Sequence, residues 1–264
     1  MLLYFCKGDV YKMDKNIFTK FVDNFKNEIT NNMVLKDAIY QEEFSGNFIK
    51  ITNCFKQIEY TKNLIDNNDF YINYSDLALM YNGNPNILIH ILLNAVFFNF
   101  NLTLYADSYL KFQACVTQIA KVLLEEYNMK LRIQIIDNKK EQHLKDNQNT
   151  FDKIIYVGDY FNFKNLQYYI TTTMQFSSYG HIKVYAGDSN IDSELTKFAY
   201  MNNIELEIYE NFDEFFAELN NDDDIICLDK EKLSLLEKLD SPTLHIYNLE
   251  KLKSGYICQF SLNH

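Results

Sequence analysis

The apolar positions of the first 70 residues repeat at the spacing of a helix. In residues 15–29, "KNIFTKFVDNFKNEI", apolar side chains fall at positions 17, 18, 21, 22, 25 and 29, which lie on one helical face. The segments 33–44 and 46–68 are interpreted as a second and a third helix. We therefore expect a helical N-terminal part, residues 1–70, that packs on the rest of the chain.

From residue 71 on, strand-like apolar runs alternate with helical patterns. Such alternation implies right-handed crossovers and a mainly parallel sheet with helices on both faces, a doubly wound α/β fold. We expect one domain over residues 1–264, with a sheet core at 71–250 and a tail or last strand at 251–264. Expected strands are 71–81, 102–105, 130–136, 153–159, 181–188, 204–210, 224–229 and 243–249; expected helices are 85–98, 108–127, 163–176, 192–203, 211–221 and 230–240. Segment 137–150 is expected to be a connection with at most one helical turn.

Charge and cysteine usage exclude some function classes. The net charge of −11 disfavours nucleic acid, and Arg132 is the only arginine. Five cysteines, with no two close in sequence, are interpreted as reduced thiols of a cytoplasmic protein. The longest apolar run, 87–100, is interrupted by His90 and Asn94 and is too short to span a bilayer. We expect no nucleic-acid partner and no membrane partner.

An asparagine-rich turn, residues 82–86, precedes the most hydrophobic segment. Backbone amides at a helix N-terminus attract anions, and asparagine side chains can donate to a carbonyl oxygen. The alternative is a simple strand–turn–helix junction with Pro85 in the first helical turn, where its missing N–H costs nothing. Both interpretations stay open here.

Further loops follow expected strands. Gly158 and Asp159 come directly after one buried run, and Gly187 comes after the next. Because ligands of open α/β sheets lie beyond the carboxyl ends of strands, these loops are expected to converge with 82–86 and 107–108. A single glycine makes no glycine-rich fingerprint, so the alternative is an ordinary helix-entry turn. Ser108 is expected to cap the helix that follows it, and Asn211 the helix after 210.

His90 and Asn94 lie four residues apart on one helical face. No Asp, Glu or Cys joins them at ligand spacing, so a hydrogen-bonded polar pair is favoured over a metal site. The other histidines have no partner that can be recognised from spacing, and no Ser–His–Asp or Cys–His arrangement is evident.

The order of these segments resembles the aldehyde dehydrogenase superfamily, most closely its gamma-glutamyl phosphate reductase branch. Tyr81, the Pro85-Asn86 turn, the helix to Phe98 and "LTLYADS" follow the family's order, and the likeness covers about residues 15–250. "FDKIIYVGD" is similar to the strand and turn that cover the cofactor in the family, and "IKVYAGDSNID" to the strand bearing its Glu-Leu-Gly-Gly-Lys segment.

The departures from the family pattern concern its chemistry. Only residues 191–210 stand where the family has a separate catalytic domain, and they contain no cysteine. Cys227 falls in a late strand and cannot be matched to the family's nucleophile. Tyr105 stands where many members have a cofactor-binding lysine, and Asp159 stands in the cofactor turn, where a carboxylate would repel a pyrophosphate.

The resemblance and its departures together predict a non-catalytic binding or scaffold protein, working with a second copy or a related enzyme subunit. The alternatives are a residual NAD(P) or other nucleotide binder acting on an aldehyde or acyl phosphate, and a structural interaction module. No cofactor follows from the residues themselves, and the resemblance implies NAD or NADP. The residues expected at such a site are Asn82, Asn84, Asn86, Tyr105, Asp107, Ser108, Gly158, Asp159 and Gly187.

Overall fold

The chain forms two compact units, one up to Ser177 that includes 260–264 and one from Ser178 to Gln259. The computed structural model describes residues 12–44, 51–67, 74–158, 160–177, 181–187, 195–196, 199, 204–219, 224–238 and 245–246. The described strands form two separate sheets, which we call sheet A and sheet B. The expectation of one sheet core over 71–250 therefore differs from the structure, because the described strands from 181 onward pair with one another and not with the strands of sheet A.

Sheet A contains five parallel strands in the order β3-β2-β1-β4-β5. In register, Tyr81 of the central strand lies beside Ala106 on one side and Val157 on the other, so these three strands end level. Nearly every residue of the central strands is buried, as expected for continuous apolar runs covered on both faces. The strands are β1 Asp76–Tyr81, β2 Asn101–Ala106, β3 Ile133–Ile136, β4 Lys153–Val157 and β5 Met174–Ser177.

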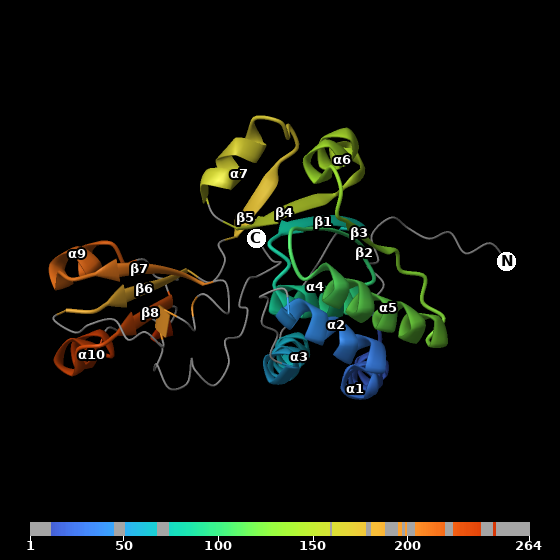
Figure 1. Cartoon of the computed structure of the whole chain (residues 1–264), viewed down its shortest axis with the longest axis horizontal. Helices are drawn as coiled ribbons and strands as arrows, with labels where there is room; N and C mark the ends of the chain where they lie inside the picture. The colour runs from blue at the N-terminus through green and yellow to red at the C-terminus, as the bar shows by residue number, and fades with distance from the viewer. Residues whose placement is uncertain are drawn as a thin grey trace. The chain divides into compact units, whose positions relative to one another are not determined.

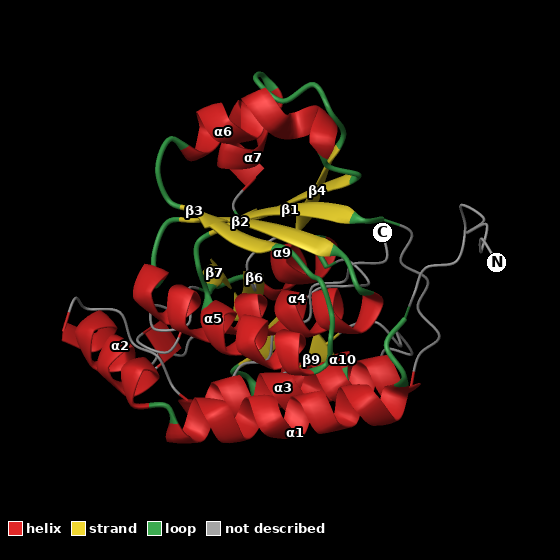
Figure 2. Cartoon of the chain, turned by 90° about the vertical axis from the view of Figure 1, so that its right-hand side faces the viewer, coloured by secondary structure: helices red, strands yellow, loops and turns green. Residues whose placement is uncertain are grey.

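One face of sheet A is covered by α4 and α5, with three N-terminal helices outside them (Figure 2). Every residue of α4 from Asn86 to Phe98 is buried, because this helix has the sheet on one side and the N-terminal helices on the other. The predicted stripe of α1 is confirmed: Phe18, Phe21 and Val22 are among its buried residues. These helices are α1 Lys15–Asn31, α2 Met33–Phe44, α3 Ile51–Asn67, α4 Pro85–Phe98 and α5 Leu110–Glu126.

The opposite face of sheet A carries α6 Lys140–Asn147, the short 3-10 helix η1 Gln148–Thr150 and α7 Tyr160–Gln167 (Figure 1). A second apolar core lies there, formed from strand residues and from the segments around these helices. Its members include Met80, Tyr105, Leu144, Phe151, Ile154, Tyr156, Phe163, Leu166, Ile170 and Met174. The doubly wound α/β fold expected from the sequence is confirmed for this unit.

The second unit contains sheet B, four parallel strands in the order β7-β6-β8-β9. Two buried apolar clusters accompany it, one including Ile182, Val184 and Leu195 and one including Tyr209 and Phe215. Its elements are β6 His181–Tyr185, β7 Glu205–Tyr209, α9 Phe212–Ala217, β8 Asp224–Cys227, α10 Lys230–Leu236 and β9 His245–Ile246.

Several expected elements differ from the structure. The helix expected at 163–176 ends at Gln167, and β5 follows it; segment 137–150 holds the two-turn helix α6. Ser108 is not a helix cap, because α5 begins after Tyr109 with no side-chain cap, whereas the predicted Asn211 cap is confirmed. Most of the expected helix 192–203 and the tail 251–264 lie outside the described residues. Within the described part of the chain, no helix has the length and apolar character needed to span a membrane.

Candidate functional site

The carboxyl edge of sheet A is the place where a fold of this topology brings loops together. From the central strand β1, the chain first builds outward to β2 and β3 and then crosses to β4 on the other side. Ligands of open α/β sheets bind at this point of reversal, beyond the strand ends. Here the reversal lies between β1 and β4, so Asn82 and Gly158 follow adjacent strands that end level.

The turn after β1 is held by its own asparagines. The Asn82 Oδ1 accepts a hydrogen bond from the backbone N–H of Asn84 at 2.9 Å, and the Asn84 Oδ1 accepts one from Asn86 at 2.8 Å. Asn84 is thus the N-cap of α4, with Pro85 in the first turn. The interpretation of this segment as a strand–turn–helix junction is confirmed.

The loops after β1 and β2 are bonded to each other. The Ser108 hydroxyl donates to the backbone oxygen of Asn82, and the Gln113 Nε2 donates to the backbone oxygen of Ser108 at 2.7 Å. The Tyr81 hydroxyl in turn donates to the Gln113 Oε1 at 2.7 Å. Gly83 makes the close approach possible, since its φ is +92° and an added Cβ would lie 2.2 Å from the Ser108 oxygen.

Gln113 was missed by the sequence reasoning, although a signal for it exists. It is a fully buried amide on the apolar face of α5, between Phe112 and Val116. A buried amide needs hydrogen-bond partners, so a polar residue within an apolar stripe predicts a nearby polar group.

A lysine from α6 also reaches this edge. Lys140 forms an ion pair with Asp107, and its Nζ donates to the backbone oxygen of Ala106 at 3.1 Å. Partial burial lowers the pKa of Lys140. Sequence reasoning missed this cation because segment 137–150 was expected to be mostly a connection.

Tyr105 lies in the core of the α6 and α7 face. Its side chain is fully buried, and its hydroxyl is hydrogen-bonded to the Nδ1 of His143 at 2.9 Å. Burial raises the pKa of Tyr105. His143 therefore has a partner that no spacing in the sequence could indicate, and the tyrosine expected at the cofactor is covered by protein.

The glycines expected at the site lie in different units. Gly158 is buried at the end of β4, where an added Cβ would lie 2.4 Å from the Tyr156 hydroxyl oxygen. Asp159 lies outside the described residues. Gly187, with φ of +55°, follows β6 in sheet B, so its expected convergence with the loops of sheet A is not supported by the strand pairing.

Three cysteines lie in the described part of the chain, and each has a raised pKa. Burial raises the pKa of Cys54 to about 12, and burial also raises the pKa of Cys115 and of Cys227. Cys6 and Cys258 lie outside the described residues. Among the described residues, no three His, Cys, Asp or Glu side chains are grouped so as to hold a metal ion.

The expected polar pair in α4 is hydrogen-bonded. The Asn94 side chain donates to the backbone oxygen of His90 at 2.8 Å, and the His90 Nδ1 lies 2.9 Å from the Thr61 Oγ1 of α3. This prediction is confirmed, and the pair helps to join α4 to α3.

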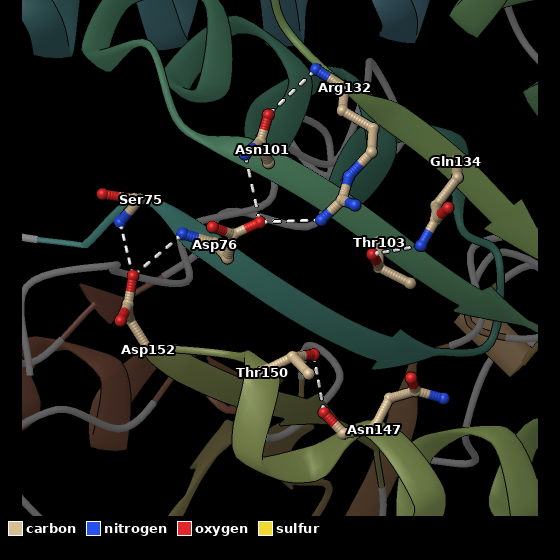
Figure 3. Close-up of polar contacts among 9 residues, drawn as sticks. All are labelled: Ser75, Asp76, Asn101, Thr103, Arg132, Gln134, Asn147, Thr150 and Asp152. Atoms are coloured by element: carbon tan, nitrogen blue, oxygen red, sulfur yellow. Dashed lines mark hydrogen bonds and ion pairs between the residues drawn. The ribbon is translucent and has the colours of Figure 1, made fainter.

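At the opposite, amino-terminal edge of sheet A, polar side chains bond across strands (Figure 3). The Asp76 Oδ1 accepts from Arg132 at 2.8 Å and from the Asn101 Nδ2 at 3.0 Å. The Asp152 carboxylate accepts from the backbone N–H groups of Ser75 and Asp76 at 2.8 and 3.1 Å. The only arginine of the chain therefore lies away from the edge where a ligand is expected.

The fold is similar to that of aldehyde dehydrogenases of known structure. Indole-3-acetaldehyde dehydrogenase in its apo form has a TM-score of 0.53 at 10% identity, with 89% of this chain and 72% of that chain covered. For gamma-glutamyl phosphate reductase from Saccharomyces cerevisiae the TM-score is 0.48 at 12% identity, covering 91% and 77%. For a variant of aldehyde dehydrogenase C from Pseudomonas syringae, in complex with NAD+ and octanal, it is 0.49 at 11% identity, covering 90% and 50%.

No protein-family model and no curated protein matches the sequence. The chain spans half or less of the length of several of the similar structures. At about 10% identity the likeness establishes the fold, and the resemblance indicated by the sequence is confirmed at that level.

Proposed function

We propose that this protein is a non-catalytic binding or scaffold protein built on an aldehyde dehydrogenase-like fold. Its partner is a second copy or a related enzyme subunit. The observation that carries the proposal is the raised pKa of the three cysteines in the described part of the chain. Oxidation of an aldehyde through a covalent intermediate needs a thiolate, and a thiol becomes reactive when its surroundings lower its pKa. Burial acts in the opposite direction on Cys54, Cys115 and Cys227.

The polar groups of the carboxyl edge give further support. The Ser108 hydroxyl joins the two loops, and the side-chain oxygens of Asn82 and Asn84 accept hydrogen bonds within the turn that leads into α4. Tyr105, in place of the family's lysine, is buried under α6. These residues stabilise the edge of the sheet instead of presenting their polar groups to a substrate.

An activity assay tests the proposal directly. The purified full chain is incubated with NAD or NADP and a panel of aliphatic and aromatic aldehydes, and, in the reducing direction, with an acyl phosphate. The expected result is no change in reduced cofactor beyond the protein-free control, with circular dichroism showing that the sample is folded. Conversion of an aldehyde or acyl phosphate at ordinary enzymatic rates would contradict the proposal.

A second function, residual nucleotide binding, is favoured by the position of Lys140 at the same edge. Lysine is a common phosphate ligand, and a ligand that binds only the folded chain raises its free energy of unfolding by RT ln(1 + [L]/Kd), and with it the unfolding temperature. Thermal unfolding with NAD, NADP, ATP or coenzyme A at millimolar concentration distinguishes the two functions. A shift that is lost in Lys140→Gln but kept in Lys20→Gln, an exposed lysine of α1, would favour this second function.

A further inference from the structure

A groove of about 450 Å³ lies between α5 and the two N-terminal helices α1 and α2. All three helices are on the same side of sheet A, with α1 and α2 in the outer layer (Figure 2). The groove contains none of the residues described at the carboxyl edge. Its lining residues are Glu28, Asn32, Val34, Ala114, Cys115, Gln118, Ile119, Val122, Leu123 and Glu126.

The walls of the groove are apolar along most of its length. The residues of α5 that line it, from Ala114 to Glu126, recur at helical spacing and cover about 18 Å of the helix axis. Val34 is 66% exposed and Val122 is 47% exposed, although both face this depression. A ligand with an apolar body that covered these side chains would remove their surface from water, which is favourable.

The charge at the groove has one sign. Glu28 and Glu126 are its charged lining residues, and among the described residues no lysine or arginine lines it. Within the described part of the chain, neither carboxylate takes part in an ion pair. Glu126 is also the last residue of α5, where the helix carries a partial negative charge. A cation is therefore attracted to this groove.

A second pocket, at the end of α5, is lined by side chains of a different charge. It has a similar size, about 420 Å³, but is lined by Lys121, Lys130 and Arg132 together with Glu125. Its charges are of mixed sign, and its arginine is paired with Asp76. The groove differs because, in the described part of the chain, its two carboxylates form no ion pair and no basic side chain lines it.

The size of the groove decides what kind of partner it accepts. A stable protein–protein interface buries about 800 Å² on each partner. A groove about 18 Å long between helices packed about 10 Å apart offers less than a quarter of that area. Its volume instead falls in the range of small-molecule sites, roughly 300–1,000 Å³.

We propose that this groove binds a small amphiphilic cation. The apolar body of the ligand lies along Val34, Ile119 and Val122, and its charged group pairs with the carboxylates of Glu28 and Glu126. Alkyl or aryl amines and quaternary ammonium compounds have this chemistry.

Cys115 provides a reporter inside the groove, since its thiol is partly exposed there. Its alkylation by N-ethylmaleimide is followed by peptide mass mapping in the full chain, with the fully buried Cys54 as an internal reference. The probe is octyltrimethylammonium below its micelle concentration. Octyl sulfate has the same chain with the opposite charge, and tetramethylammonium has the cation without the chain.

We expect octyltrimethylammonium to slow alkylation of Cys115 about threefold at twice its dissociation constant, because protection follows 1 + [L]/Kd. Octyl sulfate and tetramethylammonium should protect much less. Absence of protection by octyltrimethylammonium, or equal protection by octyl sulfate, would overturn the proposal.

The double variant Glu28→Gln, Glu126→Gln should raise the dissociation constant about fivefold, since each exposed ion pair contributes a small part of the affinity. Glu125→Gln is the matched control: it makes the same change one residue away, in the neighbouring pocket, and should leave protection of Cys115 unchanged. An unchanged dissociation constant in the double variant would contradict the assigned role of the carboxylates. All these residues are exposed, so the variants should fold normally, as circular dichroism would show.

Discussion

At the amino-terminal edge of sheet A, side chains bond from strand to strand, whereas at the carboxyl edge loops bond to loops. Asp152 and Asp76 join the starts of β1, β2 and β4 through backbone amides, Asn101 and Arg132. At the carboxyl edge, the turn at Asn82 is tied to Ser108, and Gly83 lets the backbones approach. Ligand-binding loops of open α/β sheets normally lie at this second edge. In this chain, its polar groups are largely used to hold the fold.

Among the variants at the carboxyl edge, Gly83→Ala should lower the free energy of unfolding most. The new Cβ would lie 2.2 Å from the Ser108 backbone oxygen, and the φ of +92° is unfavourable for any other residue. We expect a loss of about 3 kcal/mol or more in the free energy of unfolding. Urea unfolding followed by circular dichroism measures it, which suits a chain that has no tryptophan.

Gly187→Ala is the comparison for this change. Its φ of +55° also disfavours a side chain, but the nearest atom to the new Cβ is the hydroxyl oxygen of Tyr185 at 3.2 Å, a much less severe contact than the one at Gly83. A loss of about 1 kcal/mol is expected from backbone strain alone. Equal losses in the two variants would mean that the close approach of the two loops contributes nothing.

The amino-terminal edge should be weakened most by Asp152→Ala. This carboxylate accepts from two backbone N–H groups at the start of β1, which would both lose their partner. We expect a loss of about 2 kcal/mol, because hydrogen bonds to a charged acceptor are stronger than neutral ones. Asp23→Ala, an exposed position on α1, is the control and should change the unfolding free energy by less than about 0.5 kcal/mol. A result equal to that control would show that water replaces the carboxylate.

Tyr105→Phe probes the core beside the carboxyl edge. The variant loses the hydrogen bond to His143, and we expect a cost of about 1 kcal/mol at neutral pH. Burial raises the pKa of Tyr105 in the folded state, so the neutral phenol is favoured by folding. Its contribution is fully present below the unfolded pKa of about 10 and is lost as pH rises above it.

Urea unfolding at pH 7 to 11 tests this dependence. The stability advantage of the wild-type chain over Tyr105→Phe should shrink above about pH 10. Tyr40→Phe, which changes an exposed hydroxyl on α2, should show no such change relative to the wild type. A constant advantage across this pH range would contradict the burial of an un-ionised Tyr105.

Local patterns predicted much of the fold. The bounds of α4 agree with the prediction because both ends are marked in the sequence, by Pro85 at the first turn and by Asn99, which adopts the left-handed conformation at the C-cap. The β5 strand was missed because Phe163, Leu166, Ile170 and Met174 have helical spacing. All four are buried in one cluster, but the chain turns after α7, where the Gln148 Oε1 accepts the backbone N–H groups at 171 and 172.

Non-local partners could not be predicted. The apolar runs at 153–157 and 181–185 look alike, yet they belong to different sheets. An apolar run indicates that a strand is buried, but it does not indicate which strand pairs with it. The same limit applies at the carboxyl edge. Gln113 and Lys140 reach it from helices, 5 and 34 positions after the residues that they bond, and His143 bonds Tyr105 in the nearby core from 38 positions away. Sequence reasoning located the loops, whereas their bonding partners depended on tertiary packing.

The smallest expected effect concerns Arg132, the only arginine. Its side chain is 61% exposed and its pair with Asp76 is open to solvent, so Arg132→Gln should cost about 0.5 kcal/mol at low ionic strength. The loss should shrink further in 1 M salt, where the Debye length falls to about 3 Å. Lys130→Gln removes a neighbouring charge that has no ion pair within the described residues, and it serves as the matched control. A loss above about 2 kcal/mol that salt does not reduce would mean that Arg132 holds this edge together, a role that the comparison of the two edges assigns to Asp152.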